Sequence, residues 1–305
     1  MKIIVTGGAG FIGSHVADTF INEGHDVIIV DNLITGKKEN INPKATFHQM
    51  DIGSQDFYDL IVSEKPDVID HHAAHIHVGK SVEDPGFDAK NNIMATINMM
   101  QAAKEAGSVK KVIFASTGGA MYGNKQTPFD ESMMPQPLSP YGISKRSAEL
   151  YFYFYFNQFQ IPFTALRYAN VYGPRQNPHG EAGVISIFLE KLNQGETPVI
   201  FGDGTQTRDY VFVGDVAKAN LLALNSDQVG EFNIGTTIET DVNQIYSLVV
   251  KYYETDIKAE HGPARPGEQK TSSLNYQKAK NDLNWEPSVS LEEGIEKTVK
   301  HFKSA

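Results

Sequence analysis

Tyr141 and Lys145 are separated by three residues, a spacing that could supply an ionised phenol as a general base. Side chains at positions i and i+4 share one face of a helix. Ser139 and Pro140 stand directly before the pair and predict a helix start, as N-cap and first helical residue. An ordinary tyrosine has a pKa near 10, so its ionisation at pH 7 costs ~4 kcal/mol, which a nearby ammonium could offset. A tyrosine followed four residues later by a lysine is common by chance. Taken alone, this spacing is better explained by a surface tyrosine and a solvated lysine.

A glycine-rich segment near the start of the chain could bind a pyrophosphate. Gly7, Gly10 and Gly13 follow a short apolar run and precede a helical pattern. Gly7 and Gly10 would allow a tight turn with close backbone approach to the phosphates, and Gly13 would let helix and strand pack closely. The helix N-terminus, which includes Phe11 and Ile12, adds N–H donors and the positive end of the helix dipole.

An acidic residue at the end of the second predicted strand indicates which dinucleotide binds. Asp31 lies 18 residues after Gly13. A carboxylate there can bind the adenosine ribose hydroxyls and would repel a 2′-phosphate, so NAD is favoured over NADP. We expect Asn32 beside it, and Asp51-Ile52 at the end of the third strand flanking the adenine. A structural glycine turn with an unrelated aspartate is the weaker alternative.

Four histidines lie within seven consecutive positions, a density that suggests a metal site. Their spacing, at His71, His72, His75 and His77, matches no standard zinc pattern, and we predict no metal site. The chain contains no cysteine, which excludes disulfides, thiol catalysis and cysteine-ligated zinc.

Composition narrows the possible partners. The chain has 305 residues, with 27 Lys and Arg against 37 Asp and Glu, for a net charge of −10. Such a field repels phosphate, so neither nucleic acid nor an anionic membrane is an expected partner. The apolar run at the N-terminus is too short for a signal peptide, and no run of 18 apolar residues occurs. We therefore expect a cytoplasmic protein.

Short β-branched runs alternate with longer helical patterns through the first half of the chain. The runs are apolar on both faces, which is typical of a parallel sheet covered by helices on both sides. We predict an α/β fold with a Rossmann-type doubly wound parallel sheet. The expected strands are 3–5, 27–30, 46–50, 68–70, 112–115 and 163–166, and the expected helices are 14–23, 56–64, 88–106 and 140–159.

The pattern loosens in the second half. We expect a dinucleotide-binding domain over 1–173 and a smaller substrate-binding lobe over 174–305, above the carboxyl edge of the sheet and sharing its core. Ser290 and Glu293 form a capping box that predicts the start of a C-terminal helix. The other elements expected here are helices over 184–193, 215–224 and 242–253 and a strand over 198–201.

Together, at these positions, the glycine turn and the tyrosine–lysine pair resemble the extended short-chain dehydrogenase/reductase family. Within it, the chain is similar to the nucleotide-sugar 4-epimerases that act on UDP-glucose and UDP-galactose. The resemblance covers nearly the whole chain and includes segments 114–123, 166–175, 208–213, 233–235 and 283–287. It implies inversion of the sugar C4 through a 4-keto intermediate, with NAD regenerated in each turnover.

The resemblance also implies catalytic roles. Tyr141, as phenolate, would take the proton of the sugar 4-hydroxyl, and Lys145 would hold the nicotinamide ribose and keep the tyrosine acidic. A hydroxyl at the end of the fifth strand would bridge the tyrosine and the sugar. Many relatives carry it where this chain has Gly118. We favour Thr117, with Ser116 as a backbone or nicotinamide contact.

Further contacts follow from the same resemblance. Besides the residues already named, the resemblance implies that five more residues contact the dinucleotide: Ala73, Ala74, His75, Asn92 and Tyr168. It places at the nucleotide sugar Thr117, Tyr141, Asn170, Phe201, Arg208, Arg265 and Ser272. Counting from Arg265, Ser272 falls where relatives carry a gate at the sugar edge, and a serine there predicts tolerance of UDP-GlcNAc and UDP-GalNAc.

The aromatic run 151–156 lies within the predicted helix 140–159. No single helix face holds six consecutive residues, so the helix must be covered on several sides. The resemblance implies a homodimer in which this helix and helix 88–106 form a four-helix bundle.

Two alternatives compete with the 4-epimerase hypothesis. One is an idle dinucleotide sensor, which would not need Tyr141, Lys145, Thr117, Asn170 and Arg208 together. The other is a UDP-glucuronate 4-epimerase or another enzyme that acts through a 4-keto sugar. Gly118-Gly119 carry no acid at the position where related dehydratases and decarboxylases have one, which favours epimerisation.

Overall fold

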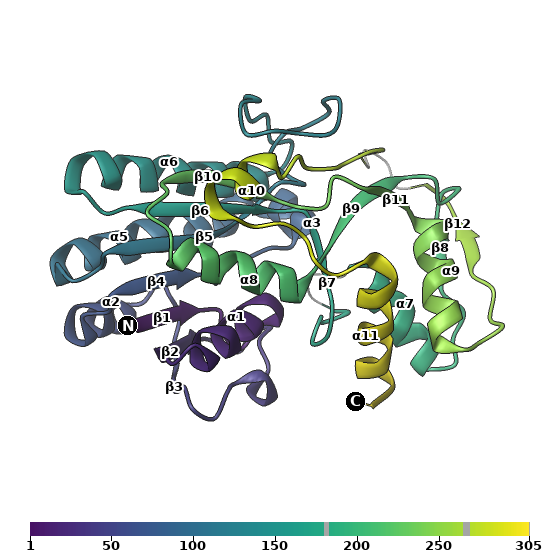
Figure 1. Cartoon of the computed structure of the whole chain (residues 1–305), viewed down its shortest axis with the longest axis horizontal. Helices are drawn as coiled ribbons and strands as arrows, with labels where there is room; N and C mark the ends of the chain where they lie inside the picture. Colours follow the sequence, from purple (N-terminus) through teal and green to yellow (C-terminus); the bar gives the residue numbers. More distant parts are fainter. Residues whose placement is uncertain (180–182, 265–268, 305) are drawn as a thin grey trace.

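Seven parallel strands form the central sheet, of which six lie where the sequence predicts them and the seventh, Gly230–Ile234, was not expected. The computed structural model describes residues 1–179, 183–264 and 269–304. The strand order is β10-β6-β5-β4-β1-β2-β3 (Figure 1). The bounds are β1 Lys2–Thr6, β2 Asp26–Asp31, β3 Thr46–Gln49, β4 Val68–His71, β5 Lys111–Thr117, β6 Phe163–Tyr168 and β10 Gly230–Ile234.

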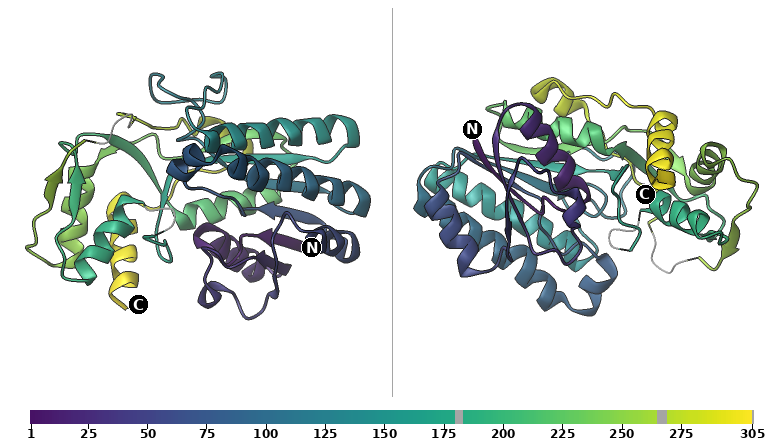
Figure 2. Two further views of the ribbon diagram at one scale, coloured as in Figure 1. Left: turned by 180° about the vertical axis from the view of Figure 1, so that it is seen from behind. Right: turned by 90° about the horizontal axis from the view of Figure 1, so that it is seen from below.

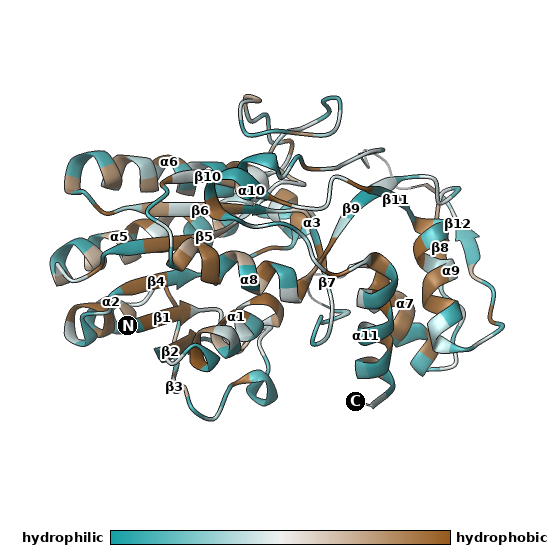
Figure 3. Ribbon diagram, viewed as in Figure 1, coloured by the Kyte–Doolittle hydropathy of each residue, from teal (hydrophilic) through white to brown (hydrophobic). Residues whose placement is uncertain are grey.

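Helices cover both faces of this sheet, which confirms the doubly wound prediction. One face packs against α1 (Phe11–Asn22), α8 (Val213–Leu224) and α10 (Gln277–Leu283). The other packs against α2 (Gln55–Glu64), α5 (Ala95–Ala106) and α6 (Pro140–Phe159). Figure 2 shows the two helical layers from behind and from below, and the strands between them are largely apolar in Figure 3.

The helix expected over 88–106 is interrupted. The chain forms α3 (Val78–Glu83) and α4 (Pro85–Ala89), then one π-helical turn over Lys90–Met94 before α5 begins at Ala95. Such turns are rare and often occur at functional sites. This one carries Asn92, whose amide is bonded to a neighbouring loop, as described below.

A smaller lobe lies beyond the carboxyl ends of the strands (Figure 1). It holds a three-stranded sheet in the order β11-β9-β7 and the parallel pair β12-β8. Apolar residues of its helices and strands, with Phe11 of α1, form a core of their own, which differs from the shared core that the sequence led us to expect. The bounds are β7 Asn170–Tyr172, α7 Val184–Asn193, β8 Val199–Phe201, β9 Thr207–Phe212, β11 Glu239–Asp241, α9 Val242–Tyr253, β12 Glu260–Gly262 and α11 Leu291–Ser304.

The second half of the chain contributes to both lobes. After β9 it returns to the large sheet, where α8 packs on α1 and β10 pairs with β6 at the sheet edge. The predicted cap of α11 is confirmed, since the Glu293 N–H donates to the Ser290 hydroxyl at 3.2 Å. None of the helices within the described ranges is long and apolar enough to span a membrane.

Candidate active site

The glycine turn between β1 and α1 has no space for side chains. Gly7 has a φ of +69°, which favours glycine, and a Cβ on it would lie 2.7 Å from the backbone nitrogen of Ala73. A Cβ on Gly13 would lie 2.3 Å from the Gly7 carbonyl oxygen. Gly10 is the N-cap of α1 and provides no side-chain cap, so no side chain competes with a phosphate for the first N–H groups, those of Phe11 and Ile12 among them. The turn therefore fits a pyrophosphate.

The residues expected at the adenosine end are brought together at the ends of β2 and β3. The Asp31 carboxylate is 6% exposed and accepts from the N–H groups of Ala9 at 3.1 Å and Leu33 at 2.8 Å. Burial raises the pKa of Asp31, so hydroxyl donors from a ribose would stabilise its ionised form. The Asn32 amide donates to Asp51 at 3.0 Å, and Ile52 is buried beside them.

The loop after β4 is braced from two sides. The Ala73 N–H donates to the Thr6 hydroxyl at 3.1 Å. Asn92 accepts from the His75 N–H at 2.8 Å and donates to the His75 carbonyl at 2.7 Å. The structure thus shows the Asn92 amide holding the Ala73–His75 backbone in place against the glycine turn.

The histidine-rich segment is integrated into the fold. The His71 ring lies between the hydroxyls of Thr6, at 2.7 Å, and Thr96, at 3.2 Å, and burial lowers the pKa of His71 well below its ordinary value. His72 lies 2.7 Å from the buried Asp70 carboxylate. Throughout the described residues, no group of three histidine or acidic side chains is placed to hold a metal ion.

Helix α6 places Tyr141 and Lys145 beside β5. The Ser139 hydroxyl accepts from the Gly142 N–H at 3.2 Å and Pro140 follows it, which confirms the predicted helix start. The Lys145 ammonium donates to the Ala115 carbonyl at 2.8 Å and lies 5.9 Å from the centroid of the Tyr141 ring. The pair therefore shares one helix face, next to the end of the strand that carries the candidate hydroxyls.

The two hydroxyls at the end of β5 have different surroundings. Ser116 is buried and donates to the Glu149 carboxylate at 2.7 Å. Thr117 is half-buried and accepts from the Ala120 N–H at 3.2 Å. A Cβ on Gly118 would lie 2.4 Å from the Leu274 side chain, so position 118 has no space for the hydroxyl residue that many relatives carry there.

Tyr168 is hydrogen-bonded through its backbone to the segment that follows Thr117. The Gly118 N–H donates to the Tyr168 carbonyl at 2.8 Å. The Tyr168 hydroxyl is paired with Asn220, and burial raises the pKa of Tyr168 well above its ordinary value. The phenol is therefore a neutral part of the core.

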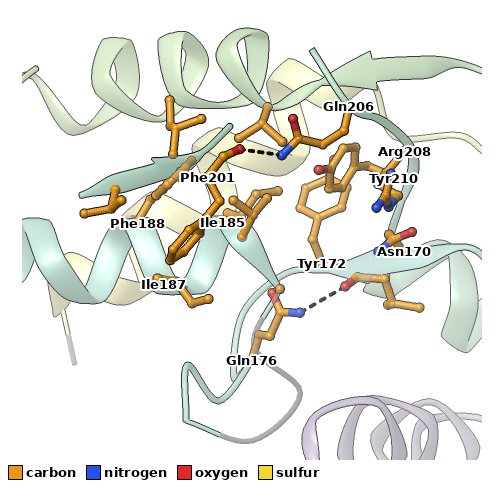
Figure 4. A pocket seen from close by; sticks show the side chains of 16 residues that line it. Asn170, Tyr172, Gln176, Ile185, Ile187, Phe188, Phe201, Gln206, Arg208 and Tyr210 are labelled. Carbon is orange, nitrogen blue, oxygen red and sulfur yellow. Dashed lines mark hydrogen bonds between the residues drawn. The ribbon is translucent and has the colours of Figure 1, made fainter. Parts of the chain in front are cut away.

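A cavity of about 190 Å³ opens in the smaller lobe, among β7, β8, β9 and α7 (Figure 4). It brings together three residues expected at the nucleotide sugar, Asn170, Phe201 and Arg208. A Cβ on Gly119 would lie 4.0 Å from the Asn170 amide oxygen, so the cavity adjoins the segment that carries Thr117. An Arg guanidinium next to an apolar wall suits a diphosphate joined to a base.

Sequence reasoning did not identify several residues that line this cavity. Tyr210 lies in the recognised segment 208–213, which was a usable signal. Gln176 is 4% exposed and donates to the Val171 carbonyl at 3.0 Å, while its amide oxygen is buried and has no hydrogen-bond partner among the described residues. Nothing local in the sequence indicated Gln176 or the apolar residues of α7.

The remaining two substrate residues lie elsewhere. Arg265 lies outside the described residues. Ser272 is 4% exposed and stands two residues before Leu274, which packs on Gly118. The adjacent Ser273 carbonyl accepts from the Phe129 N–H at 2.8 Å. The segment around Ser272 is thus attached to the loop that follows Thr117.

Comparison with known proteins agrees with this geometry. A sequence model of the NAD dependent epimerase/dehydratase family matches residues 3–235. UDP-glucose 4-epimerase from Thermotoga maritima, solved with UDP-glucose, is 48% identical, with a TM-score of 0.96 over 100% of this chain and 99% of that one. UDP-glucose 4-epimerase from Thermus thermophilus, solved with NAD, is 39% identical, with a TM-score of 0.94 over 100% of both chains.

A third solved structure is of a related enzyme with a different sugar. UDP-N-acetylglucosamine 4-epimerase from Methanobrevibacter ruminantium, in complex with UDP-N-acetylmuramic acid, is 36% identical, with a TM-score of 0.94. The match covers 99% of this chain and 98% of that one. With the fold, the glycine turn and the Tyr141–Lys145 pair in place, the chain belongs to the NAD dependent epimerase/dehydratase family.

Proposed function

We propose that this protein is an NAD-dependent UDP-glucose 4-epimerase, which interconverts UDP-glucose and UDP-galactose. One observation carries the proposal: the end of β5, with Thr117 beside the Tyr141–Lys145 helix, adjoins a cavity lined by Asn170 and Arg208. Catalytic and substrate-binding groups from both lobes therefore meet at one place.

NAD, when bound, supplies the acceptor and later the donor of a hydride. The chain's own residues fit the group: the glycine turn receives the pyrophosphate and Asp31 the adenosine ribose. Lys145, already bonded to the Ala115 carbonyl, lies where it can hold the nicotinamide ribose and favour the phenolate of Tyr141 by its charge.

The chemical step needs a base on the sugar 4-hydroxyl. The Tyr141 phenolate takes that proton as C4 loses a hydride, leaving a 4-keto sugar, and Thr117 bridges the phenol and the sugar oxygen. Once the 4-keto sugar presents its opposite face, Tyr141 would give the proton back to the sugar oxygen as C4 regains the hydride held by the cofactor. Gly118 and Gly119 provide no carboxyl group that could drive elimination. The net reaction is an isomerisation with no external oxidant.

The proposal predicts that the purified enzyme works without added cofactor. Incubation with UDP-glucose should give UDP-galactose, and acid extraction of the protein should release a nicotinamide nucleotide. UDP-GlcNAc and UDP-glucuronate, run in parallel with product analysis, identify the sugar class. Absence of any nucleotide in the extract, with no gain of activity on adding NAD, would contradict the proposal.

The apolar outer face of α6 supports the further proposal of a homodimer. Phe152 and Tyr155 of the aromatic run are buried, whereas Leu150, Tyr151, Tyr153 and Phe154 are 38% to 60% exposed. α5 lies against α6, so two copies of this pair would make a four-helix bundle.

Sedimentation of the wild-type protein should give twice the chain mass of 33.7 kDa. A charge within the α6 face, in Tyr153→Glu, should shift the equilibrium toward monomers. Ile238→Glu is the matched control, because Ile238 is 67% exposed and lies in the segment just before β11 of the smaller lobe. A monomeric wild type, or equal mass for all three proteins, would overturn this interface.

A further inference from the structure

A carboxylate buried between α6 and the end of β5 takes part in none of the steps described above. Glu149 is 1% exposed and lies in the middle of α6. It stands four residues after Lys145 and eight after Tyr141, so the three side chains follow one another along one helix face.

Each oxygen of this carboxylate accepts two hydrogen bonds. Oε1 accepts from the Ser116 hydroxyl at 2.7 Å and from Arg167 Nε at 2.9 Å. Oε2 accepts from Arg167 Nη2 at 2.7 Å and from Arg146 Nη1 at 2.9 Å. Glu149 therefore joins the catalytic helix to β5 through Ser116 and to β6 through Arg167.

The charges around Glu149 balance. Glu231 lies 3.1 Å from Arg146 and 3.5 Å from Arg167, which makes two carboxylates and two guanidinium groups. The side chain of Arg167 is 2% exposed and that of Arg146 is 28% exposed, so the inner pair of Glu149 and Arg167 is shielded from salt.

The network continues into the loop that follows Thr117. Arg167 Nη1 donates to the Tyr122 hydroxyl at 2.9 Å, and Tyr122 donates to the Asn233 amide oxygen at 2.8 Å. Burial raises the pKa of Tyr122 to about 12, so it stays a neutral donor at physiological pH. The segment 117–122 is thereby held at both ends, by β5 and by Arg167.

We propose that Glu149 is a positioning residue for catalysis: by binding Ser116 and Arg167 at once, it fixes the separation between Thr117 on β5 and Tyr141 on α6. The proposal rests on the proposed function, because it assumes that these two hydroxyls act together on the sugar. It also assigns a purpose to Ser116, whose hydroxyl donates to Glu149 of the helix.

A Glu149–Arg167 pair that served only the stability of the fold would respond to mutation differently from a pair that positions the catalytic groups. Buried ion pairs contribute little net stability against apolar replacements, since desolvation offsets their attraction. Proton transfer, in contrast, depends steeply on distance, and a shift of about 1 Å at a reacting pair can cost about 100-fold in rate. Loss of a positioning residue should therefore lower kcat much more than it changes KM or bound NAD.

Three variants separate geometry from charge. Ser116→Ala removes only the bond to β5, and Glu149→Asp keeps the charge but shortens the reach, so both should lower kcat by about 10- to 100-fold with an unchanged pH profile. Glu149→Gln also removes a negative charge about 12 Å along the helix from Tyr141. The two guanidinium groups then face only the Glu231 carboxylate, and the single positive charge left over favours the phenolate. The acid limb of the kcat profile should therefore shift down by about half to one pH unit.

Two further measurements keep the test decisive. The control is Thr298→Ala, which removes a buried hydroxyl bond within α11 of the other lobe and should leave kcat and pH profile as in the wild type. Labelling tyrosine with 13C at Cζ follows the ionisation of Tyr141 by NMR without turnover. The Tyr141→Phe variant assigns the signal. In the Glu149→Gln variant, Tyr141 should ionise at a lower pH than in the wild type.

The outcomes are distinguishable. If no UDP-sugar is epimerised by the wild type, the proposed function fails, while the NMR titration still tests the link between Glu149 and Tyr141. If the wild type is active and Ser116→Ala and Glu149→Asp retain kcat within twofold, the positioning role is overturned. A Glu149→Gln protein with unchanged Tyr141 titration contradicts the expected coupling between this charged cluster and Tyr141.

Discussion

Tyr141→Phe is expected to lower kcat for UDP-glucose by about 10²- to 10⁴-fold, the range for loss of a positioned general base. The change removes one oxygen and keeps the ring. The bond from Lys145 to the Ala115 carbonyl and the bond from the Tyr141 N–H to Ser81 do not involve the phenol. The variant should therefore keep its fold and its bound NAD, as acid extraction and thermal unfolding would show.

Tyr151→Phe provides the matched control for this experiment. It makes the same chemical change in the same helix, at a side chain that is 38% exposed and ten residues further along. Its turnover should equal that of the wild type. Near-normal turnover by Tyr141→Phe would mean that another group removes the proton of the 4-hydroxyl.

Ser272→Tyr is expected to abolish activity on UDP-GlcNAc and UDP-GalNAc while sparing UDP-glucose and UDP-galactose. The serine is 4% exposed, and its segment packs through Leu274 on Gly118 and through Ser273 on Phe129. We expect a phenol ring at this position to fill the space beside the sugar. Excluded volume rejects the larger acetamido group far more sharply than a missing contact would.

The ratio of kcat/KM for UDP-GlcNAc to that for UDP-glucose is the measurement. Ser272→Ala should keep this ratio within a few-fold of the wild type, since an alanine also leaves the space open. Wild-type protein that converts only the plain hexoses, or a Ser272→Tyr protein with an unchanged N-acetyl rate, would show that the gate lies at another residue.

The large sheet and its helices were predictable because their signals are local. β1, β2, β4, β5 and β6 are largely buried on both faces, and the helices between the strands are bounded by caps such as Ser139. The short strands of the smaller lobe, such as β7 and β11, have three residues each and carry no usable periodicity. The pairing of β10 with β6 is set by contacts between distant segments, which no local pattern encodes.

The same distinction applies to the site. The glycine turn and the Tyr141–Lys145 pair are each complete within a few residues, so their spacing identified them. The choice between Ser116 and Thr117 depends on Glu149, thirty-three residues after Ser116, and on Leu274, which occupies the space beside Gly118. Side chains so far away in the sequence leave no trace in the local motif.

The return of the chain to β10 has a consequence during synthesis. β6 keeps one edge unpaired until Ile234 has left the ribosome, after β7 through α8 have been made. An apolar edge strand is a template for pairing with other chains. Fragments that end near residue 173 should therefore aggregate, and fragments that reach past β10 should be the first to remain in solution. The nascent protein would then depend most on chaperones while the ribosome translates this intervening stretch.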